Sequence, residues 1–485
     1  MQFLKRYYGL IIVLILSFWA IRSFFIPGFF PMHDDTQVAR VFEMAKVLKA
    51  GVFPVRIVPD LGYGYGYPIF NYYAPLSYYV GAGFVFLGFD ALIATKLMMA
   101  LGVVLAGIFM YLLAREFFGE FGGIVSGLFY LYAPYHAVDI YVRGDVAEFY
   151  AYAFIPLMFL GIYKKNILIG SIGFAAIILS HNLTAMMIAP FLLIAILLNS
   201  YSAFKNKKSF ILNYSSLIFI FGLAISAFYW VPALLEINKT NVFSQIGGGA
   251  DFRDHFVCIG QLWDSLWGFG GSVAGCTDGL SFKIGKLHIL SVAASVLILI
   301  YLKLKHKHFN NIYYLSILGI AGFLISFFLM LDVSKFIWQA ISIMAFFQYP
   351  WRFLILASFF SSLLAGSLIF LARQLNIKPY LVAFPLVFFL LFFNSKLFIP
   401  QTILPRTAAD YTNEYALKWT ASKISDEYLP PDFKKPKNQN DVYKGKSNIR
   451  VQETPVEKIS NAFSLVGLLA LILGIIFYTS KRKYE

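Results

Sequence analysis

Long runs of apolar residues, separated by short polar turns, make up most of the chain. The run from Tyr7 to Phe25 is long enough to cross a bilayer of roughly 30 Å as a helix, and similar runs recur towards the C-terminus. Backbone groups find no water inside lipid, so such segments are expected to be helices. The sequence therefore predicts an all-α polytopic membrane protein with about twelve spans, at about Tyr7–Phe25, Leu92–Ala114, Gly119–Tyr135, Tyr150–Tyr163, Ile167–Ser180, Leu183–Asn199, Ile211–Val231, Leu287–Leu302, Ile312–Leu331, Trp351–Ala372, Pro379–Asn394 and Ala462–Tyr478.

Two longer stretches between these spans differ from ordinary turns. In the first, from Pro27 to about Asp90, the pattern of Thr36–Ala50 predicts an amphipathic helix at the membrane surface. Ala74–Phe89 is apolar but short and interrupted by glycine, so we expect a second interfacial or re-entrant helix there. The other stretch, Lys396–Ser460, is polar and rich in Pro and Lys, which indicates a small outer subdomain or a partly disordered tether before the last span.

Composition and charge agree with a membrane protein. Hydrophobic residues make up 59% of the 485 positions and charged residues only 13%, with a net charge of +15. The basic residues lie in short turns on alternate ends of the spans, namely Lys5–Arg6, Arg115, Lys164–Lys165, Lys205 with Lys207 and Lys208, Lys303 with Lys305 and Lys307, Arg373 with Lys378, and Lys481–Lys483. Such turns mark the cytoplasmic side, so both termini are expected in the cytoplasm.

This distribution also limits the partners of the chain. No basic face studded with aromatic residues lies outside the predicted spans, so nucleic acid is not an expected partner. No small-residue cleavage site follows the first span, so a cleaved signal peptide is not expected. We expect a multi-pass protein of the cytoplasmic membrane, in contact with membrane lipids.

Both cysteines, Cys258 and Cys276, lie in the large outer loop Pro232–Gly285. On the oxidising side of the membrane they could form a disulfide, which would stabilise the fold by about 3 kcal/mol. The alternative is two unrelated free thiols.

Polar residues that could carry chemistry gather on the predicted outer side. They are His33-Asp34-Asp35, Arg143-Gly144-Asp145-Val146-Ala147-Glu148, His181-Asn182 and Arg352. Ionised groups at membrane depth are costly unless they face a cavity, a partner or a substrate. Carboxylates, guanidinium groups and imidazoles together suit the attack of an acceptor hydroxyl on a sugar joined to a phosphate. A carboxylate would take the proton, and a cation would neutralise the departing phosphate.

Each of these groups also has a purely structural interpretation. The Asp34–Asp35 pair could cap the following helix, and the Arg143–Glu148 loop could hold only an exposed ion pair. His181 could be a hydrogen-bonded structural histidine, and Arg352 a side chain that snorkels above its span. The sequence leaves these alternatives open.

Three features together resemble the GT-C glycosyltransferases, a superfamily that includes oligosaccharyltransferases, protein O-mannosyltransferases and lipid A aminoarabinose transferases. They are the acid pair after the first span, the segment Ala74–Tyr79, and the acidic motif after the third span. Members of that superfamily resemble one another chiefly over the first seven spans, here about Met1–Val231.

Within that superfamily, a largely uncharacterised bacterial membrane family is more closely similar. The resemblance rests on His33-Asp34-Asp35, Arg143-Gly144-Asp145-Val146-Ala147-Glu148, Ser180-His181-Asn182-Leu183-Thr184 and Tyr349-Pro350-Trp351-Arg352-Phe353. The family is labelled "6-pyruvoyl-tetrahydropterin synthase-related", although nothing in this chain resembles the small soluble zinc enzyme of that name.

The resemblance implies roles for particular residues. The first-loop acid, Asp34 or Asp35, would be the catalytic base or a metal ligand. The second-loop acids, Asp145 and Glu148, would bind metal or orient the acceptor, with Arg143 beside them.

The remaining candidates would contact substrate or metal. Arg143, His181, Asn182 and Arg352 are expected to bind substrate, with the donor phosphate near Arg143 or Arg352. For Arg352, contact with the leaving phosphate is inferred from its charge and its side of the membrane. A divalent cation, Mg²⁺ or Mn²⁺, would find candidate ligands in His33, Asp34 and Asp145. The acids depart from the Asp-x-Asp spacing of some members, so metal dependence stays open.

The sequence thus predicts a GT-C-like glycosyltransferase. It would move a sugar from a polyprenyl-phosphate-linked donor to a saccharide, lipid or protein acceptor at the outer face of the membrane. The rival hypotheses are a transporter or flippase of a lipid-linked saccharide and a non-catalytic scaffold for envelope polymers. The expected parts are a catalytic module at 1–231, further spans with the cysteine loop at 232–395, the outer polar segment at 396–460, and the last span with its basic tail at 461–485.

Overall fold

The computed structural model describes residues 2–205, 213–245, 247, 250–305, 311–445 and 448–484. Over these residues the protein is helical, with three isolated bridge pairs in place of strands, at Phe29–Leu404, Val58–Tyr67 and Phe269–Leu280. Ten of the described helices are long and apolar enough to cross a membrane, so the predicted all-α polytopic class is confirmed. The basic residues Lys207, Lys208 and Lys307, and the expected span start at Ile211, lie outside the described residues.

The number of long helices is lower than the number of predicted spans for two local reasons. The second and third predicted spans share the label α5 (Ala91–Leu131), which consists of two helices that meet at a kink at Gly119, where φ is 75° and ψ is −174°. The fifth predicted span is α8 (Ile167–Ser180), whose 14 residues fall short of the roughly 20 that a full crossing requires. Every predicted span is otherwise matched by a helix.

Contacts between Cα atoms divide the chain into two units. Unit 1 comprises Met1–His33, Met99–Asp145 and Ile246–Pro405, and unit 2 comprises Asp34–Met98, Val146–Gln245 and Arg406–Glu485. Both units are built from segments that are distant in the sequence. The functional division expected from the sequence, at 1–231, 232–395, 396–460 and 461–485, stays a prediction.

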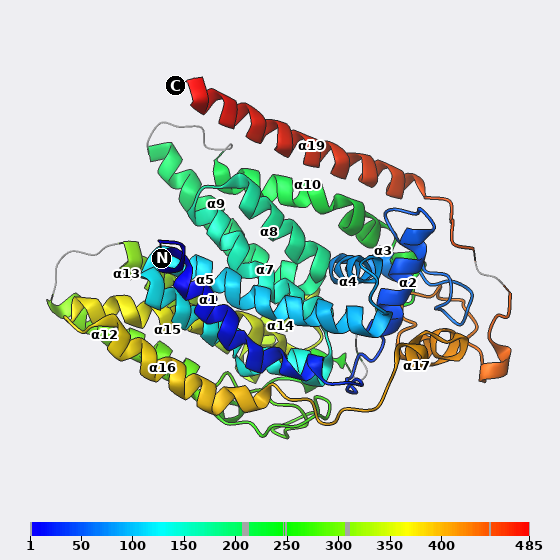
Figure 1. Cartoon of the computed structure of the whole chain (residues 1–485), viewed down its shortest axis with the longest axis horizontal. Coiled ribbons are helices and arrows are strands. Elements are labelled where there is room, and N and C mark those ends of the chain that lie inside the picture. The colour runs from blue at the N-terminus through cyan, green and yellow to red at the C-terminus, as the bar shows by residue number, and fades with distance from the viewer. Residues whose placement is uncertain are drawn as a thin grey trace. The chain divides into compact units, whose positions relative to one another are not determined.

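Unit 1 is organised around α15 (Leu354–Gln374), which packs against α12 (Lys286–Lys305) and α13 (Asn311–Leu329) (Figure 1). In the span that contains α15, 94% of the residues are buried, against 22% in the span of α16 (Pro379–Asn394). The α15 span is therefore an internal helix, whereas α16 presents most of its surface to lipid. The other elements are α1 (Gln2–Ile21), η1 (Arg22–Phe25), most of α5, α6 (Pro134–Val138), η2 (Asp139–Arg143), η6 (Phe252–Asp254), α11 (Ile259–Trp263), η7 (Asp332–Ser334), α14 (Lys335–Ala340), η8 (Ser342–Phe347), η9 (Pro350–Phe353) and η10 (Ser395–Leu397).

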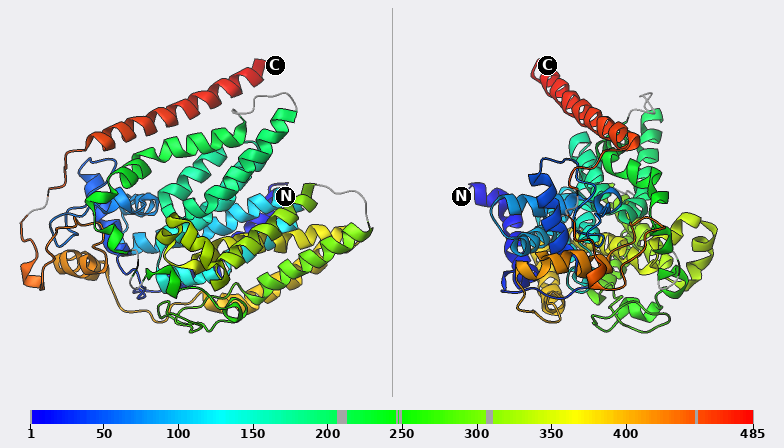
Figure 2. Two further views of the ribbon diagram at one scale, coloured as in Figure 1. Left: turned by 180° about the vertical axis from the view of Figure 1, so that it is seen from behind. Right: turned by 90° about the vertical axis from the view of Figure 1, so that its right-hand side faces the viewer.

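Unit 2 is a stack of neighbouring helices, in which α7 (Val146–Tyr163) packs on α8, α8 on α10 (Tyr214–Leu235), and α10 on α19 (Pro455–Tyr484). Figures 1 and 2 show α10 and α19 side by side. A Cβ atom on Gly161 would lie 2.1 Å from the backbone nitrogen of Gly170, so these glycines let α7 and α8 approach closely. The other elements are α2 (Gln37–Lys49), α3 (Ile69–Tyr72), α4 (Leu76–Phe86), the start of α5, α9 (Asn182–Lys205), η3 (Ile237–Lys239), η4 (Val242–Gln245), α17 (Ala408–Thr412), η11 (Ala416–Ala421), α18 (Ser422–Ile424) and η12 (Gln439–Asp441).

The two helices predicted in the first outer segment are α2 and α4, and they pack against each other: a Cβ atom on Gly81 would lie 2.6 Å from Val41 Cγ2. The polar side of α2 is buried as well, because α17 packs on α2 and Arg40 donates a hydrogen bond to Ser425 Oγ at 3.0 Å. The part of the late polar stretch that contains α17 and η11 therefore packs on α2, whereas most of its described residues between 430 and 455 are exposed.

Candidate functional site

A buried ion cluster surrounds Arg143 in unit 1. The guanidinium forms ion pairs with Asp139 and with Asp145, the latter at 2.6 Å, and its Nη1 donates a hydrogen bond to the Tyr135 hydroxyl at 3.1 Å. All three charged residues are buried. Two carboxylates pair with one guanidinium, so Arg143 is already engaged by acids within unit 1.

Arg143 also lies against Trp351, which belongs to the motif Tyr349-Pro350-Trp351-Arg352-Phe353. The Arg143 Cζ atom is 4.9 Å from the centre of the Trp351 ring, and that ring stacks on Tyr349 with centroids 5.0 Å apart. The neighbouring Arg352 is buried, with Cζ 5.4 Å from the Tyr349 ring centre. Unit 1 thus brings together two motifs that are far apart in the chain.

The backbone around Arg143 requires a glycine. Gly144 has a φ of 65°, and a Cβ atom there would lie 2.1 Å from Met32 Sδ. The segment after the first span therefore packs on this turn, and the amide of His33 donates to Val142 O at 3.1 Å. His33 Nε2 donates to Phe269 O, also at 3.1 Å, so this ring nitrogen is engaged in a structural hydrogen bond.

The two adjacent acids, Asp34 and Asp35, begin unit 2. The N-cap residue of α2 is Thr36, and its side chain makes no capping hydrogen bond, so neither acid is the N-cap that the structural interpretation proposed. Burial raises the pKa of Asp35 to about 6, and the nearby charge of Arg406 opposes part of that rise. Asp35 therefore changes its charge close to neutral pH.

Glu148 and His181 come together in unit 2. Glu148 lies in the first turn of α7 and is fully buried, and His181 lies between α8 and α9. A carboxylate oxygen of Glu148 and a ring nitrogen of His181 are within 4.8 Å of each other, a separation that one metal ion could bridge. The Thr184 hydroxyl holds the imidazole through Nδ1 at 2.8 Å, which fixes the orientation of the ring.

Asp145 belongs to the last residues of unit 1 and directly precedes α7. It is bonded to the first residue of that helix and lies three positions before Glu148. The continuity of the chain therefore keeps these two acids near each other along the backbone.

Asn182, the first residue of α9, takes part in a buried polar network. Its Oδ1 accepts a hydrogen bond from the Tyr229 hydroxyl at 2.8 Å, and its Nδ2 donates to Tyr72 O at 3.5 Å. These bonds give the amide a structural function at the N-terminus of α9. Its predicted contact with substrate stays a prediction.

Three charged residues with close charged neighbours, Asp139, Glu43 and Asp60, were not identified from the sequence. Asp139 pairs with Arg143 across one helical turn, and the spacing of four residues could have indicated it. Glu43 of α2 lies against Asp60, whose amide donates to Glu43 Oε2 at 2.9 Å. Burial, reinforced by the charge of Asp60, raises the pKa of Glu43 to about 8.

In unit 1, the cysteine loop is closed by a covalent link. Cys258 and Cys276 are joined in a disulfide, with Cα atoms 5.5 Å apart. It encloses the exposed residues Trp263 and Leu266 of the outer loop.

Comparison with known proteins identifies a family for part of the chain. Residues 70–245 match a family described as "6-pyruvoyl-tetrahydropterin synthase related domain; membrane protein". This segment contains Asp145, Glu148 and His181, so the family resemblance predicted from the motifs is confirmed there. An uncharacterized protein of Lactococcus lactis subsp. cremoris (strain MG1363) is 25% identical over 262 residues, which cover 51% of this chain and 42% of that protein. The match thus spans less than half the length of this relative.

Similar solved structures come from the oligosaccharyltransferase of Archaeoglobus fulgidus. The apo form is 14% identical with a TM-score of 0.43, covering 89% of this chain and 57% of that chain. The AglB complex with an inhibitory peptide and a dolichol-phosphate is 14% identical with a TM-score of 0.44, covering 88% and 57%. A complex with Zn and sulfate is 15% identical with a TM-score of 0.35, covering 87% and 54%. The chain thus spans a little over half the length of these enzymes.

Proposed function

We propose that this protein is a membrane glycosyltransferase that moves a sugar from a polyprenyl-phosphate-linked donor to an acceptor at the outer face of the cytoplasmic membrane. The observation that carries the proposal is the buried pair Glu148 and His181, placed where helices of a membrane unit begin. A carboxylate and an imidazole are costly to bury in such a unit without a charged ligand or a reaction to serve.

Asp35 is the proposed catalytic base. Its pKa of about 6 leaves the carboxylate mostly ionised at neutral pH, yet basic enough to accept a proton in the transition state. The acceptor hydroxyl would give its proton to Asp35 while its oxygen forms a bond to the anomeric carbon. The bond from that carbon to the phosphate oxygen breaks, and the electron pair leaves with the polyprenyl phosphate.

Glu148 and His181 are the proposed ligands of a divalent cation, Mg²⁺ or Mn²⁺. A carboxylate together with an imidazole suits the softer Mn²⁺ in particular. The expectation from the sequence that Asp145 binds metal stays a prediction. When bound, the cation would neutralise charge on the leaving phosphate. His33 and Asp34, the other ligand candidates from the sequence, stay predictions.

The two arginines have different proposed functions. Arg143 is shared between two carboxylates, so we assign it to positioning Asp145 and not to binding phosphate. Arg352 is the proposed contact of the leaving phosphate, on the basis of its charge. Substituting Arg143 and Arg352 one at a time tests these two assignments separately.

The test uses the full-length protein in proteoliposomes with a labelled lipid-linked sugar and a mixture of candidate acceptors. Glu148→Gln is expected to lower sugar transfer by about 10²-fold or more, because it would remove a ligand of the cation that neutralises charge on the leaving phosphate. The matched control is Glu414→Gln, because Glu414 is exposed and pairs only with Lys418 across one helical turn.

Full transfer by Glu148→Gln, with the control also active, would refute the proposal. Release of free polyprenyl phosphate separates this function from its rival. A flippase would move the labelled lipid to the other leaflet with the sugar still attached, and such a result would also overturn the proposal.

A further inference from the structure

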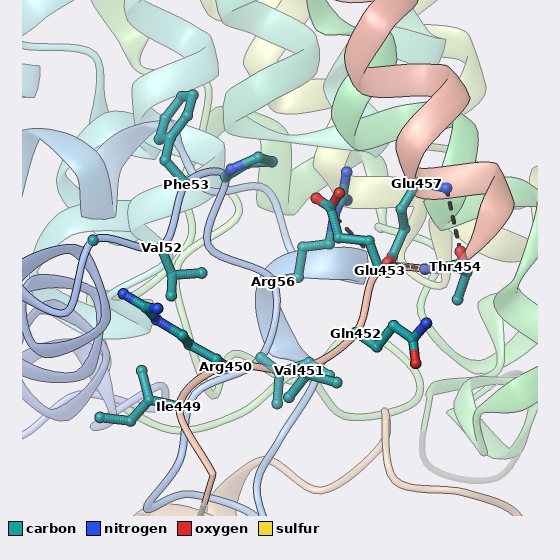
Figure 3. A pocket seen from close by; sticks show the side chains of 13 residues that line it. Val52, Phe53, Arg56, Ile449, Arg450, Val451, Gln452, Glu453, Thr454 and Glu457 are labelled. Atoms are coloured by element: carbon teal, nitrogen blue, oxygen red, sulfur yellow. Dashed lines mark hydrogen bonds and ion pairs between the residues drawn. The ribbon is translucent and has the colours of Figure 1, made fainter.

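A cavity of about 410 Å³ lies in unit 2, away from Glu148 and His181 in the sequence. It is lined by the loop Gly51–Ile57 and by residues 449–454, which lead into α19, together with Glu457 in the first turn of that helix (Figure 3). Every residue of the lining belongs to the same unit, so the cavity is a property of unit 2 itself.

Arg56 supplies a buried positive charge at this cavity. The residue is only 6% exposed, and its two terminal nitrogens donate hydrogen bonds to Asn71 Oδ1 at 2.8 Å and to Asn461 Oδ1 at 2.7 Å. The remaining nitrogen, Nε, makes no hydrogen bond within the described residues and lies 3.8 Å from Glu457 Oε1. A buried guanidinium nitrogen without a hydrogen bond indicates a place for another acceptor.

Charges of both signs line the same space, and Figure 3 labels these side chains. Glu453 accepts a hydrogen bond from Asn461 at 2.7 Å, and Glu457 accepts one from the Thr454 amide at 2.8 Å as part of the N-terminal cap of α19. Arg450 is exposed on the rim, where it donates to Ala50 O at 3.2 Å. The cavity therefore offers both a cationic and an anionic contact.

The cavity lies beside the first turn of α19, a helix long and apolar enough to cross a membrane. Only a few residues further along, Ile459, Phe463 and Val466 of α19 are exposed apolar side chains. With this part of α19 in the hydrocarbon, the cavity would lie at the level of the lipid headgroups. Phe53 is also exposed, at the rim of the cavity. A ligand that enters here would have its polar part in the cavity and its apolar part along α19.

We propose that this cavity binds the headgroup of a zwitterionic phospholipid that carries a primary ammonium, such as a phosphoethanolamine lipid. Its phosphate would contact Arg450 and Arg56, and its ammonium would contact Glu453. A purely anionic lipid, including a polyprenyl phosphate donor, would place its charge beside two carboxylates, and it is disfavoured for that reason.

A chain of hydrogen bonds connects the cavity to α9. Arg56 binds Asn71, Asn71 Nδ2 donates to Glu236 Oε2 at 3.4 Å, and the Tyr72 hydroxyl donates to Glu236 O at 3.0 Å. The Tyr72 carbonyl in turn accepts from Asn182, next to His181. A bound headgroup would thus stabilise the segment that holds the start of α9.

The experiment measures lipid retention directly and does not depend on any activity. Full-length protein is reconstituted in nanodiscs with equal amounts of phosphatidylethanolamine, phosphatidylcholine and phosphatidylglycerol, extracted in mild detergent, and the retained lipids are quantified by mass spectrometry. Phosphatidylethanolamine is expected to be enriched about fivefold over the anionic lipid, the effect of one partly exposed charge pair. Phosphatidylcholine should be retained less well, because its quaternary ammonium has no N–H donor for Glu453.

Two variants and two controls make the test specific. Glu453→Gln and Arg450→Gln should each abolish the enrichment. Glu414→Gln, at an exposed carboxylate, and Arg253→Gln, at an exposed guanidinium, lie elsewhere and should preserve it. Equal retention of the three lipids by the unaltered protein would overturn the proposal, and so would enrichment that survives both cavity variants.

Discussion

Arg143 and Trp351 are stacked in unit 1, with the guanidinium carbon 4.9 Å from the centre of the indole ring. The contact joins the turn after α6 to the turn before α15, and the same guanidinium bridges Asp139 and Asp145. A planar, permanently charged fork can pair with two carboxylates and stack on an aromatic face at once, which an ammonium cannot do.

The first prediction follows from this geometry. Arg143→Gln would leave two buried carboxylates without their cation, so we expect a loss of about 3–5 kcal/mol in the free energy of unfolding. Arg143→Lys retains the charge but loses the bidentate contact, and its loss should be smaller. Thermal unfolding of the detergent-solubilised variants measures both, and equal stability of Arg143→Gln and the unaltered protein would contradict the prediction.

The second prediction concerns pH and Asp35. If Asp35 is the base, sugar transfer should rise about tenfold per pH unit below pH 6 and level off above it, because only the ionised carboxylate accepts a proton. Asp35→Asn should be inactive at every pH, whereas Asp34→Asn should keep the same inflection. An unchanged pH profile in Asp35→Asn would exclude this residue as the base.

The free energy of unfolding should also depend on the protonation of Asp35, but it should fall as the pH rises. The pKa of Asp35 is higher in the folded protein, at about 6, than its ordinary value of 3.8, so the folded state binds more protons than the unfolded state between these values. Its contribution to stability is therefore fully present below about pH 4 and is lost as the pH rises through 6. The difference in melting temperature between Asp35→Asn and the unaltered protein, measured from pH 4 to pH 7, should increase in favour of the variant.

The third prediction concerns the cation site. Mn²⁺ should raise the melting temperature of the unaltered protein, and Glu148→Gln should remove that shift. Thr184→Val keeps His181 but removes the hydroxyl that orients its ring, so we expect Mn²⁺ affinity to fall by about 10–100-fold. If Mn²⁺ stabilises Glu148→Gln as strongly as the unaltered protein, this residue is not a ligand.

The spans were predictable from the sequence because lipid imposes a minimum length of apolar residues on each crossing. The break in α5 also had a local signal, since Gly119 adopts a backbone conformation that favours glycine. Trp351 beneath Arg143 had no such signal, because the contact depends on how helices distant in the sequence pack together. The same is true of Glu43, which occupies the polar side of an amphipathic pattern and is nevertheless fully buried.

The late outer segment was harder to predict for a related reason. Its composition resembles that of a linker, and its few apolar residues bury little surface on their own. Its stability comes from partners in the first outer segment, such as Tyr63, whose hydroxyl donates to Asp426 at 3.1 Å and whose amide donates to Ser422 Oγ at 3.0 Å. Pairings between segments this far apart in the sequence cannot be read from local patterns.

The last prediction tests that pairing through Arg40, which is buried where α2, α4 and the late outer segment meet. Its guanidinium carbon lies 4.5 Å from the Tyr73 ring centre, and its terminal nitrogens donate to the Tyr78 hydroxyl at 3.2 Å and to Ser425 Oγ at 3.0 Å. Arg40→Lys cannot keep both hydrogen bonds and the stacking, so the late segment should lose about 1–3 kcal/mol of local stability. Limited proteolysis should then cleave residues 406–445 faster in Arg40→Lys than in the exposed control Lys49→Arg, while α7 to α10 remain protected. Equal cleavage rates in the two variants would mean that Arg40 does not hold this segment in place.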